Sequence, residues 1–540
     1  MSGTAHTVFE AFMVTAVAAP DNVFLCAPPA AGRGYHPDGV EFTYGQTRDA
    51  ALGLRDVYAG AGYGHGHRVA LLLENRPEFF FHYLALNALG AGIVPINPDH
   101  RHDEMAYQME HSEADLAVVL ASRVGDLEAV ARERSKPLPV VSAEAMPSAL
   151  PRPGPPPRGG RPGLDTETSL LYTSGTTGRP KGCMLTNFYY LNAGAWYCEL
   201  GGHIRIERGR ERILNPLPLF HMNSQAVSAT AAILTANCLA QPERFSPSRW
   251  WKDVVASDAT IIHYLGVMPP LLLNQPQAQE ERGHRVKFGL GAGVEPELHQ
   301  AFERRFGFPL IEVWGMTETG RIYADCHEPR QVTTRAFGRP HGGLEARVVD
   351  DKDHDVAGGV EGELLVRWGG LEGPRHGFFS GYLKNAEATE EAWRGGWLHT
   401  GDAVRQADDG MLYFVDRKKN IIRRAGENIA AAEVEACLQA HETVAQVAVL
   451  AVADEVREEE VMACVVAVAG ATADRALAEK IQDWCLSRLA YFKAPGWVLF
   501  VDRLPTTGTQ KVQKTHIFPR GEDPRQRPGA LDVRDRKKRR

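Results

Sequence analysis

The chain has 540 residues, of which 44% are hydrophobic and 24% are charged. These values are ordinary for a globular protein, and the length suffices for several structural units with a large core. The 60 Lys and Arg residues against 67 Asp and Glu residues give a net charge of −7, so no global attraction to nucleic acid or to an acidic membrane is expected.

The cysteines and the hydropathy pattern favour a cytoplasmic protein. None of the eight cysteines forms a CxxC pair or a metal-ligand spacing with His, so we expect buried thiols in a reducing compartment. The apolar residues 8–19 include Glu10 and lack a preceding Lys or Arg, which indicates an amphipathic helix and not a signal peptide. No apolar stretch approaches membrane-spanning length, so no integral membrane segment is expected.

Strand and helix signals alternate along the first half of the chain. Short apolar runs at 68–73, 93–95 and 116–120 predict strands, and 77–89 carries apolar residues at helical spacing. This alternation predicts parallel βαβ units. Residues 147–163, dense in Pro, Gly and Arg, predict a linker. A second sheet is expected from 261–265, 287–290 and 310–313, followed by a strand-rich region that includes 345–349 and 363–367.

Residues 171–182 are the most informative stretch of the chain. Glycines allow several backbone N–H groups to point at one anion, and hydroxyls and a lysine add donors and charge. We therefore predict a phosphate-binding segment, although its spacing differs from the P-loop pattern. A flexible polar linker is the alternative interpretation. The predicted residues are Thr173, Ser174, Gly175, Thr176, Thr177, Gly178 and Lys181.

Two further segments suit a nucleotide. The strand at 310–313 leads into Trp314, Gly315, Met316, Thr317 and Glu318. The indole can cover a base and the carboxylate can hold a hard cation beside phosphates, although a Trp that only fills the core is the alternative. Asp402 ends the stretch 396–402, where it could accept hydrogen bonds from both ribose hydroxyls or serve as a structural cap.

In this order, the segments resemble the adenylate-forming superfamily of acyl-CoA synthetases, luciferases and peptide-synthetase adenylation domains, from about residue 8 to residue 518. Residues 218–221, 396–402 and 414–417 look most similar to acyl-CoA ligases, nearest to the crotonobetaine/carnitine-CoA ligase branch. The resemblance implies an AMP-forming acid–thiol ligase that makes acyl-AMP and then acyl-CoA. Transfer of the acyl group to a carrier protein or another acceptor is the alternative, and a binding protein without catalysis is a third hypothesis.

The resemblance also implies the fold class, which is α/β. A large N-terminal domain, residues 1–416, is expected to contain two βαβ sheets and a β-rich subdomain. A small mobile α+β domain is expected at 417–520, followed by a basic tail at 521–540 that we expect to be disordered.

Further roles follow from the resemblance. Residues 173–181 would cradle the β- and γ-phosphates of ATP, Thr317 and Glu318 would order Mg²⁺, and Lys511 would be the catalytic lysine. Gln510 replaces the glycine that usually precedes this lysine, so Lys514 stays open as the alternative. The remaining nucleotide residues implied are Asp402 and Arg417 for the ribose and Gly291, Ala292 and Gly293 for the adenine side, with an ordinary tight turn as the alternative for these three.

For the thiol step, the resemblance makes Lys419 the hinge and places Gly426 where the pantetheine arm of CoA passes, with a plain turn glycine as the alternative. His221, Met222 and Asn223 are the expected acyl-contact residues, although a lone His near an apolar run is often a core residue. Residues 221–225 contain no acid to meet a trimethylammonium group, so a short or medium carboxylic acid is expected. ATP, Mg²⁺ and CoA are the expected cofactors, in a monomer or homodimer without a nucleic-acid partner.

Overall fold

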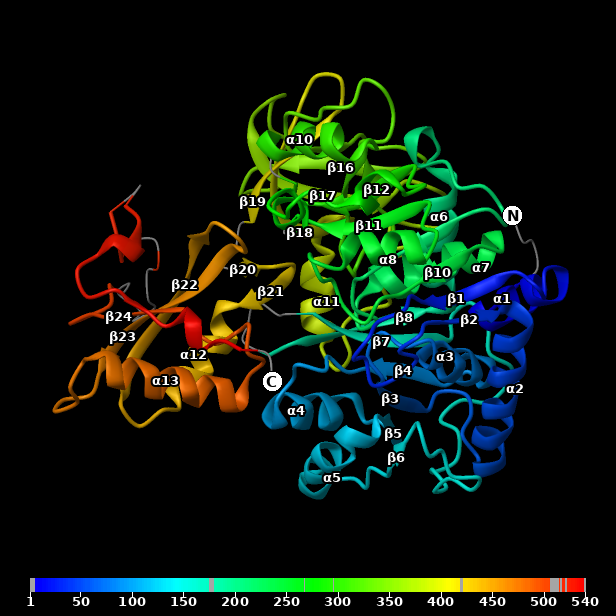
Figure 1. The fold of residues 1–540 in the computed structure, drawn as a ribbon. Coiled ribbons are helices and arrows are strands. Elements are labelled where there is room, and N and C mark those ends of the chain that lie inside the picture. The colour runs from blue at the N-terminus through cyan, green and yellow to red at the C-terminus, as the bar shows by residue number, and fades with distance from the viewer. Residues whose placement is uncertain are drawn as a thin grey trace. The chain divides into compact units, whose positions relative to one another are not determined.

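A largely parallel sheet occupies the first part of the chain (Figure 1). The computed structural model describes residues 5–173, 179–266, 268–294, 296–417, 421–505, 514, 517–519 and 522–538. The strand order is β6-β5-β3-β4-β7-β8, and the pairs from β6 to β7 are parallel, which confirms the predicted βαβ units. The strands are β3 (Arg68–Leu72), β4 (Gly92–Pro95), β5 (Leu116–Val119), β6 (Val140–Ser142), β7 (Glu167–Thr173) and β8 (Lys181–Thr186).

The second sheet has the order β14-β13-β12-β11-β9-β10-β1-β2. Its strands from β13 to β1 are parallel, and antiparallel strands close both edges. The strands are β1 (Val23–Ala27), β2 (Val40–Thr43), β9 (Arg212–Leu214), β10 (Cys238–Ala240), β11 (Ile261–Leu265), β12 (Phe288–Ala292), β13 (Leu310–Trp314) and β14 (Tyr323–Ala324).

One hydrophobic core joins both sheets to the helices between their strands. α3 is buried on nearly all sides, because it packs against other helices as well as against its sheet, and its buried side chains are apolar except for His82 and Asn87. The helices of this part are α1 (Val8–Ala18), α2 (Tyr44–Ala61), α3 (Glu78–Leu89), α4 (His102–Ser112), α5 (Val124–Glu133), α6 (Asn187–Glu199), α7 (Thr230–Thr235), α8 (Trp250–Ala256), α9 (Met268–Leu273) and α10 (Pro296–Phe306).

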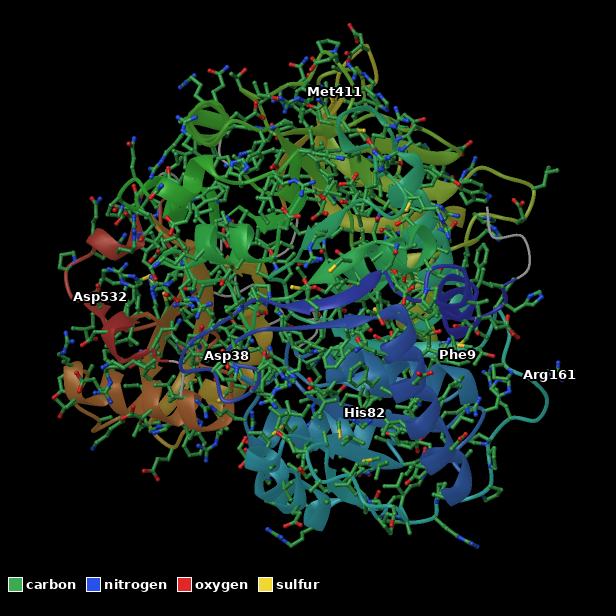
Figure 2. All side chains as sticks on the ribbon, turned by 45° about the vertical axis from the view of Figure 1, so that its right-hand side comes forward. Phe9, Asp38, His82, Arg161, Met411 and Asp532 are labelled. Atoms are coloured by element: carbon green, nitrogen blue, oxygen red, sulfur yellow. The ribbon has the colours of Figure 1, made fainter. Side chains whose placement is uncertain are left out.

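The Pro-rich segment 147–163 has no regular secondary structure, but it is bonded to the residues that precede β3. The hydroxyl of Tyr63 donates to the carbonyl of Pro151, and the backbone N–H of Arg158 donates to the carbonyl of His65. Arg161 points outward from this segment, whereas His82 of α3 lies in the interior (Figure 2). The segment is therefore a surface connection with fixed contacts.

A third sheet, antiparallel and in the order β15-β19-β18-β17-β16, confirms the predicted strand-rich region. It contains β15 (Ala336–Gly338), β16 (Leu344–Val349), β17 (Glu361–Trp368), β18 (Leu398–Gln406) and β19 (Leu412–Arg417), with α11 (Ala386–Ala392) between β17 and β18.

The chain divides into two compact units. The first comprises Met1–Pro98, Met109–Leu171 and Gly182–Asp416, and the second comprises Asp99–Gln108, Tyr172–Lys181 and Arg417–Arg540. The second unit has its own core and a sheet in the order β21-β20-β23-β24-β25, with β22 paired to β23. Its elements after β19 are β20 (Ile421–Arg424), β21 (Glu427–Ala430), α12 (Ala431–Gln439), β22 (Val444–Asp454), β23 (Glu458–Ala467), α13 (Arg475–Arg488), β24 (Trp497–Phe500) and β25 (Leu531–Asp532).

The basic C-terminal segment is ordered from 522 to 538, so the prediction of a disordered tail was wrong. β25 pairs antiparallel with β24, and Val533 is fully buried. Arg534 forms an ion pair with Asp454 at 3.0 Å, and buried Lys537 donates to the carboxylate of Glu460. The acidic partners lie far away in the sequence, which is why the local run of charge suggested a solvated tail.

Candidate active site

Two of the candidate nucleotide segments lie at the carboxyl ends of neighbouring parallel strands. β12 ends at Ala292 and β13 ends at Trp314, with Gly291 paired to Glu312 across the two strands. Ligands of open parallel sheets bind at this edge. The structure therefore brings together segments 291–293 and 314–318. Gly291 lies in β12 itself, where a Cβ would come within 2.2 Å of the carbonyl oxygen of Tyr264.

Glu312 is a buried carboxylate that our sequence reasoning missed. It accepts hydrogen bonds from the backbone N–H groups of Gly293 at 2.8 Å and Val294 at 3.3 Å, and from the hydroxyl of Tyr264 at 2.6 Å. Burial raises the pKa of Glu312 to about 7, although the three donors oppose this shift. The carboxylate thus anchors a loop whose Ala292 and Gly293 are exposed. An acid within the apolar run 309–313 was its signal in the sequence.

The indole of Trp314 is bonded to the carboxylate of Asp402. Its Nε1–H donates to Oδ2 at 2.9 Å, and the two residues are 6% and 3% exposed. One face of the indole stacks on Tyr323, with ring centroids 5.7 Å apart. Trp314 is therefore partly a core residue, and its polar edge is directed at the residue expected to bind ribose.

Asp402 lies on an irregularity of the third sheet. The pairing of β17 with β18 shifts register between Glu363 and Leu365, and Gly401 adopts a φ of +70°. Bulges of this kind redirect a side chain and occur next to active sites. The bulge accounts for the orientation of Asp402 toward Trp314.

Thr317 and Glu318 follow β13 in a turn that other segments hold in place. The hydroxyl of Tyr189 donates to the Thr317 carbonyl at 2.7 Å, and the hydroxyl of Tyr382 donates to Oε1 of Glu318 at 2.8 Å. The backbone N–H of Phe379 donates to the Glu318 carbonyl at 3.0 Å. Burial and the charge of Glu318 raise the pKa of Tyr382, so this tyrosine stays a donor. Neither tyrosine stands in a sequence motif that could have indicated its contact with residues 317 and 318.

The predicted phosphate segment connects two adjacent strands. β7 ends at Thr173 and β8 begins at Lys181, so the connection differs from the strand-to-helix loop of P-loop proteins. The carbonyl of Pro180 accepts a hydrogen bond from Tyr107 at 2.9 Å, and the Arg179 guanidinium lies 5.1 Å from the centre of that ring. The residues outside the described part of the segment are Ser174, Gly175, Thr176, Thr177 and Gly178.

The expected acyl-contact residues lead into a π-helix, Asn223–Ala229. Such helices occur frequently at functional sites. Oδ1 of Asn223 accepts from Nδ2 of Asn215 at 2.8 Å and lies 2.8 Å from Nδ1 of His263. Burial lowers the pKa of His263 to about 3, so this polar network is neutral. His221 packs against the ring of its neighbour Phe220, with centroids 4.5 Å apart.

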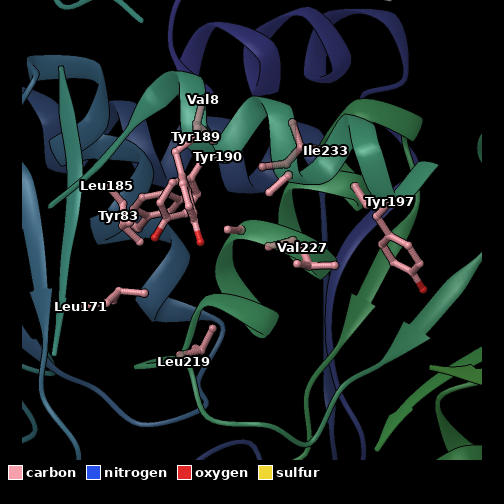
Figure 3. Close-up of a cluster of buried hydrophobic side chains, with 14 of the residues drawn as sticks. Val8, Tyr83, Leu171, Leu185, Tyr189, Tyr190, Tyr197, Leu219, Val227 and Ile233 are labelled. Atoms are coloured by element: carbon pink, nitrogen blue, oxygen red, sulfur yellow. The ribbon is translucent and has the colours of Figure 1, made fainter. Parts of the chain in front are cut away.

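α6 packs against the π-helix. Figure 3 shows Val227 of the π-helix in one hydrophobic cluster with Tyr190 and Tyr197 of α6. The hydroxyl of Tyr190 also donates to the side chain of Gln225 at 2.7 Å. The half-buried Met222 packs against the same core. This packing gives the expected acyl-contact region a rigid base.

In the second unit, Gly426 lies in the two-residue turn between β20 and β21. Ala425 and Gly426 have φ values of +51° and +84°, as in a type I′ hairpin turn. Lys514 forms an ion pair with Glu435 of α12 at 2.7 Å. Lys419 and Lys511 lie outside the described residues, as does the side chain of Arg417.

Within the described ranges, no group of three or more His, Cys, Asp or Glu side chains could hold a metal ion. A buried carboxylate such as Glu318 nevertheless suits Mg²⁺, which in nucleotide sites takes most of its ligands from phosphate oxygens and water. The same part of the chain contains no helix that is both long and apolar enough to cross a membrane.

Comparison with known proteins identifies similar sequences over nearly the whole chain. Residues 13–383 match the AMP-binding enzyme family, and residues 433–511 match the AMP-binding enzyme C-terminal domain. The chain is 30% identical over 496 residues to the crotonobetaine/carnitine–CoA ligase of Proteus mirabilis, covering 88% of this chain and 93% of that protein. It is 32% identical over 528 residues to the sulfoacetate–CoA ligase of Cupriavidus necator, covering 95% and 97%.

Solved structures show the same fold. An o-succinylbenzoate CoA synthetase of Bacillus subtilis, bound to a product analogue, matches with a TM-score of 0.79 at 24% identity, covering 94% of this chain and 97% of that one. The amide bond synthetase McbA of Marinactinospora thermotolerans matches with a TM-score of 0.77 at 25% identity, covering 94% and 98%.

Proposed function

The chain belongs to the AMP-binding enzyme family, and from this we propose how its residues perform the reaction of an ATP-dependent acyl-CoA ligase. It is an AMP-forming acid–thiol ligase, as its CoA ligase relatives are. A carboxylic acid is activated as acyl-AMP with release of pyrophosphate, and the acyl group then passes to CoA with release of AMP. One observation carries the assignment of residues: the Trp314–Asp402 hydrogen bond lies at the carboxyl end of the strand that leads into buried Glu318.

The nucleoside is proposed to lie between the loop 291–293 and Trp314, with Gly315 and Met316 beside it. The exposure of Ala292 and Gly293 at the end of a parallel strand supports this placement. Asp402 would accept hydrogen bonds from the ribose hydroxyls, and Arg417 would reach the same sugar. The bond from Trp314 fixes the carboxylate of Asp402 for this role.

Phosphate activation requires positive charge, because the attacking carboxylate and the α-phosphate repel each other. We assign residues 173–181 to the β- and γ-phosphates and Glu318, with Thr317, to Mg²⁺. The bound ion would neutralise phosphate charge. Lys511 would bridge the carboxylate and the α-phosphate. The ion pair of Lys514 with Glu435 supports this register, because it gives Lys514 a structural role.

Thioester formation would use the second unit. Gly426 would border the path of the pantetheine arm, and Lys419 would be the hinge about which this unit turns. The type I′ turn is a second reason for a glycine at 426, because this turn requires a positive φ there, which glycine adopts without strain.

The acid is proposed to be short and polar, and to contact His221, Met222 and Asn223. The neutral network of Asn223, Asn215 and His263 supports a polar pocket floor. The two relatives are named for sulfoacetate and for crotonobetaine and carnitine, which are small polar acids.

The test is to incubate the purified protein with ATP, Mg²⁺, CoA and a panel of acids that includes sulfoacetate, crotonobetaine, carnitine, acetate and longer fatty acids. We expect AMP release and loss of free thiol in equal amounts with short polar acids. Pyrophosphate release without loss of free thiol, with turnover that continues only when an amine is added, would instead favour transfer to another acceptor. The likeness to an amide bond synthetase suggests this outcome as the alternative.

A further inference from the structure

Arg321 is a fully buried arginine three residues after Glu318. It is 2% exposed, and among the described residues no carboxylate lies within ion-pair distance of its guanidinium. Three aromatic rings surround the cation instead. The guanidinium carbon lies 4.3 Å from the ring centre of Trp368, 5.6 Å from that of Trp196 and 5.9 Å from that of Phe378. These distances are those of cation–π contacts.

The guanidinium also joins two separate segments. Its Nη1 donates to the carbonyl of His376 at 2.7 Å, and its Nη2 donates to Oδ1 of Asn192 on α6 at 3.1 Å. Gly377 allows this close approach, because a Cβ there would lie 2.5 Å from Nη2. Burial lowers the pKa of Arg321 to about 10, so the side chain stays cationic at neutral pH.

The same two segments hold Glu318. The chain just after His376 supplies the N–H of Phe379 to the Glu318 carbonyl and the hydroxyl of Tyr382 to its carboxylate. α6 supplies the Tyr189 hydroxyl to the carbonyl of Thr317. Arg321 and Glu318 therefore share one set of supporting segments.

A buried cation without a paired acid is costly, and an apolar side chain of similar volume would fill this cage more stably. A lysine has no planar fork, so it cannot reach a carbonyl and an amide in the two fixed directions that the guanidinium uses. The presence of an arginine at this position therefore points to a geometric requirement.

We propose that Arg321 is a positioning residue for Glu318: by clamping residues 376–378 and α6, it sets the position of Tyr382 and thereby orients the Glu318 carboxylate. Arg321 acts through these segments. The inference rests on the proposed role of Glu318 beside Mg²⁺ and the phosphates.

The test measures how acid-dependent pyrophosphate release by the full chain depends on the Mg²⁺ concentration at saturating ATP. For R321M and Y382F, we expect the Mg²⁺ concentration at half-maximal rate to rise tenfold or more, while the KM for the acid changes less than twofold. R321K should be intermediate. In E318Q the Mg²⁺ dependence should also shift, and adding R321M to E318Q should shift it no further.

Arg330→Met is the matched control, since Arg330 is mostly buried but pairs with Glu303 at 2.8 Å. Its loss should lower thermal stability without moving the Mg²⁺ midpoint. If E318Q shifts the midpoint but R321M and Y382F do not, the inference is overturned while the role of Glu318 stands. If E318Q itself has no effect, the proposed role of Glu318 fails and the inference falls with it. Y382F and R321K decide the matter should R321M not fold.

Discussion

Replacing Glu312 with Gln tests whether a buried carboxylate anchors the proposed adenine loop at the expense of stability. The pKa of Glu312 rises from the usual 4.5 to about 7 through burial. The folded state therefore binds the proton more tightly than the unfolded state. The resulting stabilisation is complete below about pH 4.5 and is lost as the pH rises through about 7. A shift of this size corresponds to about 3 kcal/mol.

Glu312→Gln is neutral at every pH, so its free energy of unfolding should exceed that of the wild type by up to about 3 kcal/mol at pH 8 and approach it near pH 5. Activity should change in the opposite sense. The amide cannot replace the carboxylate toward Gly293, Val294 and Tyr264 together, and a bond to a charged group contributes about 1.5–3 kcal/mol. We expect kcat/KM for ATP to fall about tenfold or more at pH 8.

The assay combines urea unfolding at pH 5 to 8 with ATP kinetics over the same range. Glu303→Gln is the control, because the pKa of Glu303 is shifted in the opposite direction to that of Glu312. The ion pair of Glu303 with Arg330 and its contact with His299 hold the pKa of Glu303 at about 2 despite partial burial. Its stabilisation is present above about pH 4.5 and is lost as the pH falls through about 2, so this variant should be less stable than the wild type throughout the assay range. A stability difference for Glu312→Gln that is constant from pH 5 to 8 would refute the reasoning.

Three further predictions concern Trp314, the catalytic lysine and the C-terminal segment. Trp314→Phe removes the donor to Asp402 and should lower kcat/KM for ATP by about tenfold to a hundredfold, without an additive loss when combined with Asp402→Asn. Lys511→Ala should abolish pyrophosphate release yet spare thioester formation from supplied acyl-AMP. Lys514→Ala should show no such selectivity, and the assignment of the catalytic lysine moves to 514 if it does. Val533→Asp buries a charge in the second unit and should lower the free energy of unfolding by about 3 kcal/mol or more, measured by thermal or urea unfolding, whereas a solvated tail would tolerate it.

Elements with a local signal were predictable from the sequence. β11 has the expected bounds, Ile261–Leu265, and α3 begins within one residue of the expected helix. Hydrophobic periodicity and chain-breaking residues carry this information within about fifteen residues. β9 and β10 were missed, because strands of three residues show no period. The pairing of β1 with β10 joins Leu25 to Leu239, and no local pattern encodes so distant a contact.

Candidate site residues could also be proposed from the sequence, because Trp314, Glu318 and Asp402 each stand in a short, recognisable stretch. The sequence by itself therefore determined the family and the reaction class, and it nominated the residues that we propose for the site. Only the tertiary structure decided the partners of those residues: the indole on Asp402, the tyrosines on the 317–318 turn, and the aromatic cage around Arg321. The physical reason is that local preference acts within a segment, whereas a buried polar contact depends on which distant segments pack together.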